Sequence, residues 1–103
     1  KKSNSPISEI VYSINEDKYG NIWLGTKEGA SKLNPTTGAV QNYTIEDGLG
    51  GNNIYSIYRD SKNTLWFGAL GGTLSSYDNK NFKKYLFFIL KSIFLVLHYF
   101  ISN

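Results

Sequence analysis

One phrase occurs twice in this chain, and its spacing constrains the fold more than any other feature. The phrase "GNIWLGT" at residues 20–26 returns as "NTLWFGA" at residues 63–69, and the only two tryptophans, Trp23 and Trp66, lie 43 positions apart. The same spacing relates other pairs, among them Tyr12 and Tyr55, Ser13 and Ser56, Asp17 and Asp60, and Gly25 and Gly68. A period of roughly 40 to 45 residues fits a four-stranded propeller blade or a helical repeat of the HEAT type.

Local chemistry favours strands over helices. The segment "IVYSINED", residues 10–17, is rich in β-branched and aromatic residues, and turn residues follow it before "IWLGT". Glycine or proline every few residues excludes a long helix. In residues 22–25 both alternating faces are apolar or small, which is typical of a strand covered on both sides. The sequence therefore predicts an all-β fold of two four-stranded antiparallel β-propeller blades.

The repeat also predicts how the chain is divided. We expect an N-terminal stub at 1–8, a first blade at 9–47, a connector at 48–52, a second blade at 53–85 and an apolar tail at 86–103. Propellers close with typically 4 to 8 blades, so two blades form an incomplete propeller with uncovered faces. Such a piece is not expected to behave as a well-folded monomer by itself.

Several motifs together resemble one known family. The run "DKYGNIWLGT" at 17–26, the turn Pro35-x-x-Gly38 and the connector "DGL" at 47–49 are similar to the two-component regulator propeller repeat. That repeat builds the sensor region of hybrid histidine kinases found mainly in Bacteroidetes, and the resemblance covers about residues 7–85. The second copy departs from it at Asn63-Thr64 and Ala69.

The resemblance implies a function, a location and partners. It implies a piece of a periplasmic sensor region of an inner-membrane protein, which recognises a glycan-derived ligand and controls transcription through a histidine kinase and phosphorelay. The partners implied are further blades of a parent chain and an oligosaccharide. Ligand contacts are expected in loops on one propeller face, at Lys27, Glu28, Asn52 and Asn53. Two alternatives stay open: a propeller scaffold for protein partners, and a piece of a polysaccharide lyase or glycosidase.

The repeated residues have structural interpretations and functional alternatives. Trp23 and Trp66 are expected to fill seams between blades, with Gly25 and Gly68 leaving room for them; the alternative is an exposed tryptophan that stacks on a sugar ring. Asp17 and Asp60 precede turns, where a carboxylate accepts backbone N–H groups. The alternative for these two carboxylates is a cation site or an acid–base role.

No catalytic, metal or cofactor site is predicted for this stretch. The chain has no cysteine, and its one histidine, His98, lacks a second histidine for a metal site or a recognisable triad partner. The net charge of +3 is diffuse and does not indicate a nucleic-acid surface. We therefore expect this stretch not to be an enzyme, with any histidine kinase activity elsewhere in a parent protein.

The ends of the chain raise separate questions. It begins with Lys1 rather than methionine, so it is expected to be a piece of a longer product. From residue 86 to residue 101, all but Lys91, Ser92 and His98 are apolar or aromatic. Three interpretations of this tail remain: a frameshifted or read-through end, a membrane segment, and a buried strand or helix. The Lys83-Lys84 pair before it favours a cytoplasmic location for the blades by the positive-inside rule, against the periplasmic expectation.

Overall fold

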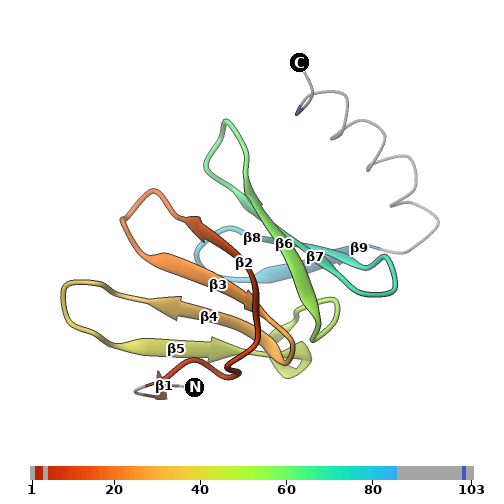
Figure 1. Cartoon of the computed structure of the whole chain (residues 1–103). Helices are drawn as coiled ribbons and strands as arrows, with labels where there is room; N and C mark the ends of the chain where they lie inside the picture. Colours follow the sequence, from red (N-terminus) through yellow and green to blue (C-terminus); the bar gives the residue numbers. More distant parts are fainter. Residues whose placement is uncertain (1, 4, 86–100, 102–103) are drawn as a thin grey trace.

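The chain folds into two antiparallel β-sheets that follow one another along the sequence (Figure 1). The computed structural model describes residues 2–3, 5–85 and 101. The strands are β1 (Lys2–Ser3), β2 (Val11–Glu16), β3 (Ile22–Thr26), β4 (Gly29–Leu33), β5 (Val40–Tyr43), β6 (Ile54–Arg59), β7 (Leu65–Ala69), β8 (Leu74–Tyr77) and β9 (Phe82–Tyr85). The first sheet has the order β1-β5-β4-β3-β2 and the second the order β6-β7-β8-β9.

The predicted all-β fold of two blade-like meanders is confirmed. In each sheet four consecutive strands pair antiparallel with their neighbours, and the short strand β1 adds to the outer edge of the first sheet beside β5. The turns between strands contain the glycine, asparagine and aspartate residues that the sequence suggested. The predicted apolar tail, residues 86–103, lies outside the described residues except for position 101.

The segment before β2 packs on the first sheet instead of projecting from it. The Ile7 amide donates to Ser31 Oγ at 3.0 Å, and in the second blade the Gly50 amide donates to Ser75 Oγ at 2.9 Å. These two bonds occupy matching places in the two repeats. Residues 5–10 therefore take the position on the first blade that the connector takes on the second, so part of the expected stub 1–8 belongs structurally to a repeat.

The connector between the sheets begins with a short capped turn. The 3₁₀ helix η1 (Ile45–Asp47) has a capping box, in which Thr44 Oγ1 accepts from the Glu46 amide and Asp47 Oδ2 accepts from the Thr44 amide. Gly48 ends the turn at φ 107°, a conformation that favours glycine. The chain then crosses from the outer edge of the first sheet to the inner strand of the second.

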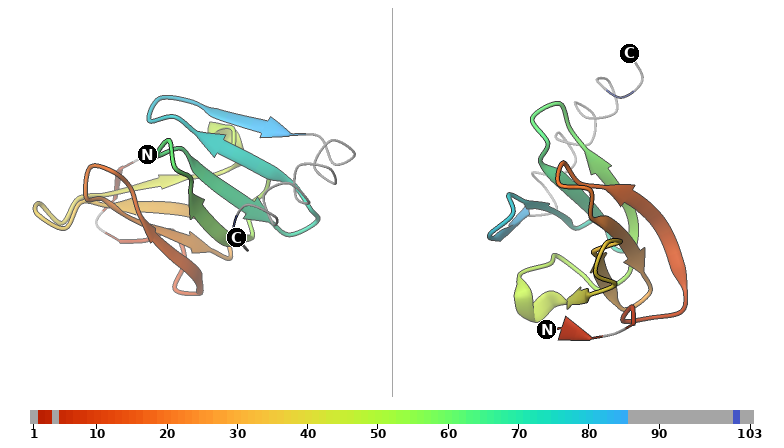
Figure 2. Two further views of the ribbon diagram at one scale, coloured as in Figure 1. Left: turned by 90° about the horizontal axis from the view of Figure 1, so that it is seen from above. Right: turned by 90° about the vertical axis from the view of Figure 1, so that its left-hand side faces the viewer.

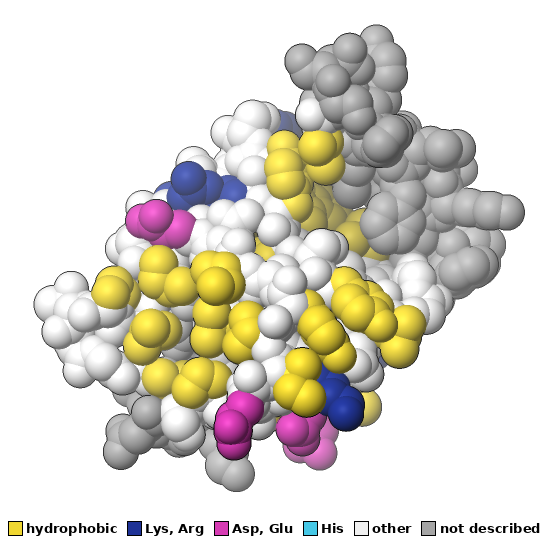
Figure 3. All heavy atoms as spheres, in the orientation of Figure 1, with side chains coloured by type: hydrophobic (Ala, Val, Ile, Leu, Met, Phe, Trp, Pro, Cys, Tyr) yellow, Lys and Arg dark blue, Asp and Glu magenta, His cyan; other side chains and the backbone are white. Residues whose placement is uncertain are grey.

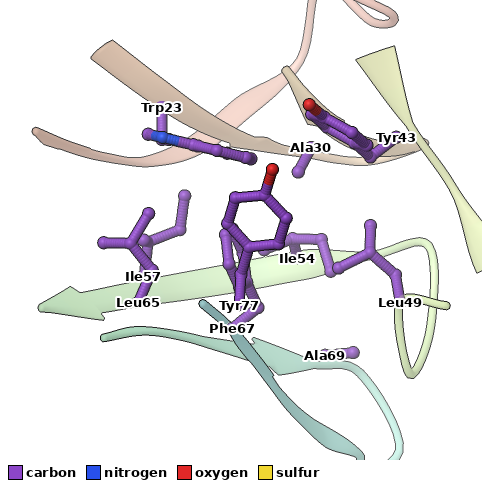
Figure 4. Packing of buried hydrophobic residues seen from close by; sticks show 10 residues of the cluster. All are labelled: Trp23, Ala30, Tyr43, Leu49, Ile54, Ile57, Leu65, Phe67, Ala69 and Tyr77. Atoms are coloured by element: carbon purple, nitrogen blue, oxygen red, sulfur yellow. The ribbon is translucent and has the colours of Figure 1, made fainter. Parts of the chain in front are cut away.

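The two sheets pack face to face along a seam, with the inner strands β2 and β6 side by side (Figure 2). The side-chain nitrogen Nδ2 of Asn15 donates to the Ile57 carbonyl oxygen at 2.9 Å across this seam. Ten buried apolar residues from both sheets and the connector form the core (Figure 4): Trp23, Ala30, Tyr43, Leu49, Ile54, Ile57, Leu65, Phe67, Ala69 and Tyr77. The seam between the blades is thus the hydrophobic core of the molecule.

Trp23 lies at the centre of the seam with none of its surface exposed. Its ring stacks on Tyr43 of the same blade at 5.4 Å between centroids. It meets Phe67 of the second blade edge-on at 5.3 Å and Tyr77 at 5.2 Å. These are favoured geometries for aromatic pairs. Trp23 therefore joins the two sheets.

Gly25 of β3 lets this strand approach the inner strand β6 of the second blade closely. A Cβ atom at this position would lie 2.7 Å from the Ile54 carbonyl oxygen and 2.9 Å from Ile54 Cγ2, and would also overlap Ser13 Oγ. At the equivalent Gly68, a Cβ atom would meet only Ser56 Oγ, at 2.7 Å. Because a backbone oxygen cannot move aside as a hydroxyl can, the first glycine is required by packing between the blades.

Candidate ligand edge of the two blades

Both inner strands begin at the same edge of the molecule. The Lys27 amide donates to the Ile10 carbonyl at 3.0 Å, and the Leu70 amide donates to the Asn53 carbonyl at 2.9 Å. Each bond ties the turn after the second strand of a blade to the residue before its inner strand. We call this side of the sheets the strand-start edge; it consists of residues 10–12, 27–28, 44–55 and 70–72. Function in β-structures commonly resides in such connecting loops.

Two tyrosines form an exposed aromatic pair at the strand-start edge. Tyr12 and Tyr55 are 42% and 46% exposed, and their ring centroids lie 5.0 Å apart with the planes tilted by 40°. Each tyrosine lies at a β-bulge. The pairing of β2 with β3 shifts between Val11 and Ser13, and the pairing of β6 with β7 shifts between Ile54 and Ser56. Such bulges re-aim a side chain and are frequent beside binding sites.

The predicted ligand residues Lys27 and Glu28 are exposed in the turn between β3 and β4. Thr26, which is fully buried, supports this turn: its hydroxyl donates to the Gly29 carbonyl at 2.8 Å and accepts from the Glu28 amide at 3.1 Å. The two charged side chains therefore project from a turn whose backbone is fixed. In the second blade Ala69 stands at the equivalent place and has no hydroxyl for such bonds.

The other two predicted ligand residues, Asn52 and Asn53, are half-buried in the connector before β6. Asn52 Oδ1 accepts from the Ile45 amide at 3.1 Å, so one end of this side chain holds the connector together. The structure brings all four predicted residues to the strand-start edge, two on each blade. Sequence reasoning missed the tyrosine pair there, although Tyr12 and Tyr55 match at the repeat spacing.

Asp17 holds the turn before β3 and also the seam tryptophan. Its Oδ1 accepts from the Tyr19 and Asn21 amides, both at 2.9 Å, and its Oδ2 accepts from Trp23 Nε1 at 2.9 Å. Burial favours the neutral carboxyl, but the hydrogen bonds from Trp23 and Asn21 outweigh it and hold the pKa of Asp17 below its usual value. The carboxylate therefore has a structural role, because both of its oxygens accept hydrogen bonds from the turn or from Trp23.

Asp60 repeats this arrangement in a more open setting. Its Oδ2 accepts from Trp66 Nε1 at 2.8 Å, and its Oδ1 accepts from the Thr64 and Lys62 amides. Trp66 is half-buried and contacts Tyr85, with the ring centroids 5.4 Å apart and the planes tilted by 40°. Trp66 lies on the face of the second sheet that points away from the first, because it alternates with the seam residues Leu65 and Phe67 along β7.

Replacing Asp17 with asparagine is expected to lower the free energy of unfolding at pH 7 by about 1–3 kcal/mol, because bonds to a charged acceptor are lost. A carboxyl whose pKa falls on folding stabilises above its unfolded pKa, and this contribution disappears as the pH falls through its folded pKa. Urea unfolding at several pH values between about 7 and 2 should show a shallower acid decline in Asp17→Asn than in the native chain. The exposed Glu9→Gln serves as the control, and an equally steep decline in Asp17→Asn would contradict this role.

A polar hollow lies at the edge of the first sheet opposite to the strand-start edge. Its volume is about 260 Å³, and it is lined by Asn21, Lys32, Asn34, Ala39, Val40 and Gln41. Lys32 Nζ lies 5.7 Å from the centroid of the Trp23 ring. Two of the amide side chains already bond within turns: Asn21 Nδ2 donates to Asp17 Oδ2, and Asn34 Oδ1 accepts from the Thr36 amide. The hollow is therefore mainly a by-product of turn structure.

Across residues 2–3, 5–85 and 101, no cluster of three or more histidine, cysteine or acidic side chains is placed to hold a metal ion. In the same part of the chain no helix has the length and hydropathy to cross a membrane. His98 and most of the apolar tail lie outside the described residues.

Comparison with known proteins identifies the repeats. The family model described as "two component regulator propeller" matches residues 5–28 and again residues 48–71. Each matched segment starts in the chain that precedes an inner strand and ends in the turn after the second strand of the blade. Both repeats are two-component regulator propeller repeats. The repeat unit therefore includes the connector that packs on the blade it precedes.

The proteins that this chain matches are much longer than it, and it spans only 5–11% of their length. Histidine kinase P4 of Formosa agariphila is 36% identical over 67 residues, which are 63% of this chain and 5% of that protein. The extracellular domain of a protein described as a hybrid two-component system of B. thetaiotaomicron superposes with a TM-score of 0.67 at 27% identity, over 78% of this chain and 11% of that one. The extracellular domain of a protein described as a one-component system of the same organism gives 0.61 at 26% identity, over 74% and 11%.

Proposed function

We propose that this chain is two blades of the ligand-sensing propeller of a membrane-bound two-component sensor, exposed to the periplasm, and that its strand-start edge contacts a glycan-derived ligand. Histidine kinase activity and control of transcription would reside in other parts of such a sensor. The repeats and the extracellular structural relatives support the sensor assignment. The observation that carries the ligand edge is the exposed pair Tyr12 and Tyr55.

The chemistry of this edge suits an oligosaccharide. A tyrosine offers an apolar ring face and a polar hydroxyl, which together match the mixed surface of a sugar ring. The bulges in β2 and β6 present the two rings side by side, and the turn holding Lys27 and Glu28 lies at the same edge. A few placed polar groups around an apolar platform are typical of small-molecule sites.

The positions of the two rings are fixed before any ligand arrives. Each tyrosine belongs to a strand paired in a sheet, and the two strands are held together by the buried seam. Binding to a preformed platform loses less conformational freedom than binding to a loose loop. This supports recognition by the tyrosine pair, with Lys27, Glu28, Asn52 and Asn53 as flanking polar contacts.

Thermal unfolding with defined tetrasaccharides tests the proposal. The probes are neutral fragments of arabinan, xylan and galactan and acidic fragments of pectin and heparin. A ligand present at 100 times its Kd should stabilise the chain by about 2.7 kcal/mol. The double variant Tyr12→Ala, Tyr55→Ala should lose this shift, and Lys27→Ala should reduce it.

The matched control is Tyr19→Ala, which removes another exposed tyrosine, 63% exposed, from the turn at the opposite edge. It should retain the full ligand shift. If the ligand still stabilised the double tyrosine variant, the ligand would not bind at this edge. If no probe stabilised the native chain, recognition of these glycans by the two blades would be contradicted.

A further inference from the structure

We propose that the strand-start edge selects neutral glycans over acidic ones, so that the sugars lying over these two blades carry no uronate or sulfate groups. This inference rests on the proposed function and names the chemical class of its ligand. The charged side chains of the edge and the exposed apolar side chains beside them support it.

The strand-start edge has the opposite charge to the chain as a whole. Its charged side chains are Lys27, Glu28, Glu46 and Asp47, three carboxylates against one ammonium group, whereas the whole chain carries a net charge of +3. Within the part of the chain that the structure describes, no ion pair joins a lysine or arginine to these carboxylates. Figure 3 shows acidic groups along the lower side of the molecule, where β2 and β6 begin (Figure 1), next to hydrophobic side chains. An anionic sugar would therefore approach an edge of its own sign.

The three carboxylates belong to two segments that meet on the first blade. Glu28 precedes Gly29, where a Cβ atom would lie 3.6 Å from Thr44 Cγ2. Thr44 is the N-cap of η1, which carries Glu46 and Asp47. The turn after β3 and the start of η1 therefore lie against each other, and their negative charges act on the same part of the edge.

Backbone connections place both charged segments beside the tyrosine pair. Asn52 Oδ1 accepts from the Ile45 amide at 3.1 Å, which ties η1 to the segment that leads into Tyr55. The Lys27 amide donates to the chain that leads into Tyr12, at 3.0 Å. A sugar ring that stacks on the two tyrosines is therefore flanked by the turn after β3 and by η1.

The rest of the edge offers apolar side chains and no compensating cation. Ile10, Ile45 and Leu70 are 48%, 51% and 58% exposed, and Leu70 takes in the second blade the place that Lys27 takes in the first. Lys27 is the one basic residue of the edge, and Glu28 follows it in the same turn. A uronate or sulfate group placed here would lose hydration without gaining a net positive partner, which costs free energy.

A neutral sugar meets none of these costs. Its C–H groups can contact the apolar side chains and the tyrosine rings, and its hydroxyl groups can donate to the carboxylates. Like charges facing each other at a binding surface disfavour the wrong partner more than they strengthen the right one. The edge therefore discriminates between glycans by repelling the acidic ones.

Matched pairs of tetrasaccharides test this selectivity on the whole chain by calorimetric titration. Each neutral fragment of arabinan, galactan or xylan is compared with the same fragment carrying carboxylates, introduced by oxidation of primary alcohols or, for xylan, by a glucuronate branch. In about 0.01 M salt, where charges act over about 30 Å, the neutral fragment should bind about tenfold more tightly than its acidic counterpart. In about 1 M salt this range falls to about 3 Å, and the ratio should shrink towards one.

Reversing one charge of the edge separates the effect of charge from that of shape. Glu46→Lys changes an exposed side chain outside the proposed ligand contacts, and Asp47 keeps its capping bond to the Thr44 amide. This variant should bind the acidic fragment about threefold more tightly than the native chain does in low salt, with the affinity for the neutral fragment unchanged. The control Glu16→Lys makes the same charge change at an exposed position of the opposite edge, and it should leave both affinities unchanged.

The outcomes separate this inference from the proposed function. If the native chain bound an acidic fragment at least as tightly as its neutral counterpart, and the double variant Tyr12→Ala, Tyr55→Ala abolished that binding, the selectivity would be overturned and the glycan edge would stand. A ratio that neither salt nor Glu46→Lys changes would also overturn the selectivity by charge. If no fragment bound, the proposed function and this inference would both be contradicted.

Discussion

Replacing Trp23 with alanine is expected to lower the free energy of unfolding by about 3–5 kcal/mol, a large part of the total stability of a small domain. The indole ring is fully buried and contacts Tyr43, Phe67 and Tyr77. Its removal leaves a cavity in the seam between the two sheets, and it leaves Asp17 without a buried donor.

Trp66→Ala is the matched control, because it removes the same residue from the same place in the second repeat. Trp66 is only half-buried and has Tyr85 as its aromatic neighbour. Trp66→Ala should therefore lower the free energy of unfolding clearly less than Trp23→Ala. Urea unfolding followed by circular dichroism, at concentrations where the chain is monomeric, compares the two. Equal losses would contradict the assignment of Trp23 to a seam between blades.

Gly25→Ala is expected to lower the free energy of unfolding nearly as much as Trp23→Ala, although it adds only one methyl group. The new Cβ atom would lie 2.7 Å from a backbone oxygen of the second blade, and neither strand can shift without breaking its pairing. Overpacking of this kind costs typically 1–3 kcal/mol and more where backbone is displaced. The expected result is a lower urea midpoint and weaker packing of the two sheets.

Gly68→Ala supplies the comparison for this glycine. In a monomer its methyl group displaces only the Ser56 hydroxyl, and alanine suits a strand better than glycine. Its stability should stay within about 1 kcal/mol of the native value. If Gly25→Ala lowered the stability as little as Gly68→Ala, the close approach of β3 to β6 would be contradicted.

Much of the fold could be predicted because each repeat contains local signals for its strands and turns. The phrase around Trp23 marks the second strand of a blade, and Asp17 and Asp60 mark the turns before it. These signals are local, so the strand order within each sheet followed from them. The alternation of Trp23 with Ile22 and Leu24 also followed from the strand pattern, whereas Trp66 was expected in a seam and lies on the outer face of the second sheet.

The remaining features depend on contacts that the local pattern does not contain. The pairing of β1 with β5 and the packing of residues 5–10 on the first sheet join segments that are distant in sequence. The tyrosine pair arises from two bulges that align only when the sheets pack. Lys27 and Asn53 were predicted from loop position, and the structure places both at the strand-start edge; the tyrosine pair at this edge was not predicted.

The packing of the two repeats as adjacent blades underlies the proposed ligand edge, and a double-mutant cycle between Trp23→Phe and Phe67→Leu tests this packing most directly. The two rings lie 5.3 Å apart across the seam, so we predict a coupling energy of about 0.5–1.5 kcal/mol. Trp66→Phe with Phe67→Leu should give a coupling near zero, because these neighbours in sequence point to opposite faces of β7. A coupling near zero for Trp23 with Phe67 would show that the blades do not pack through this seam.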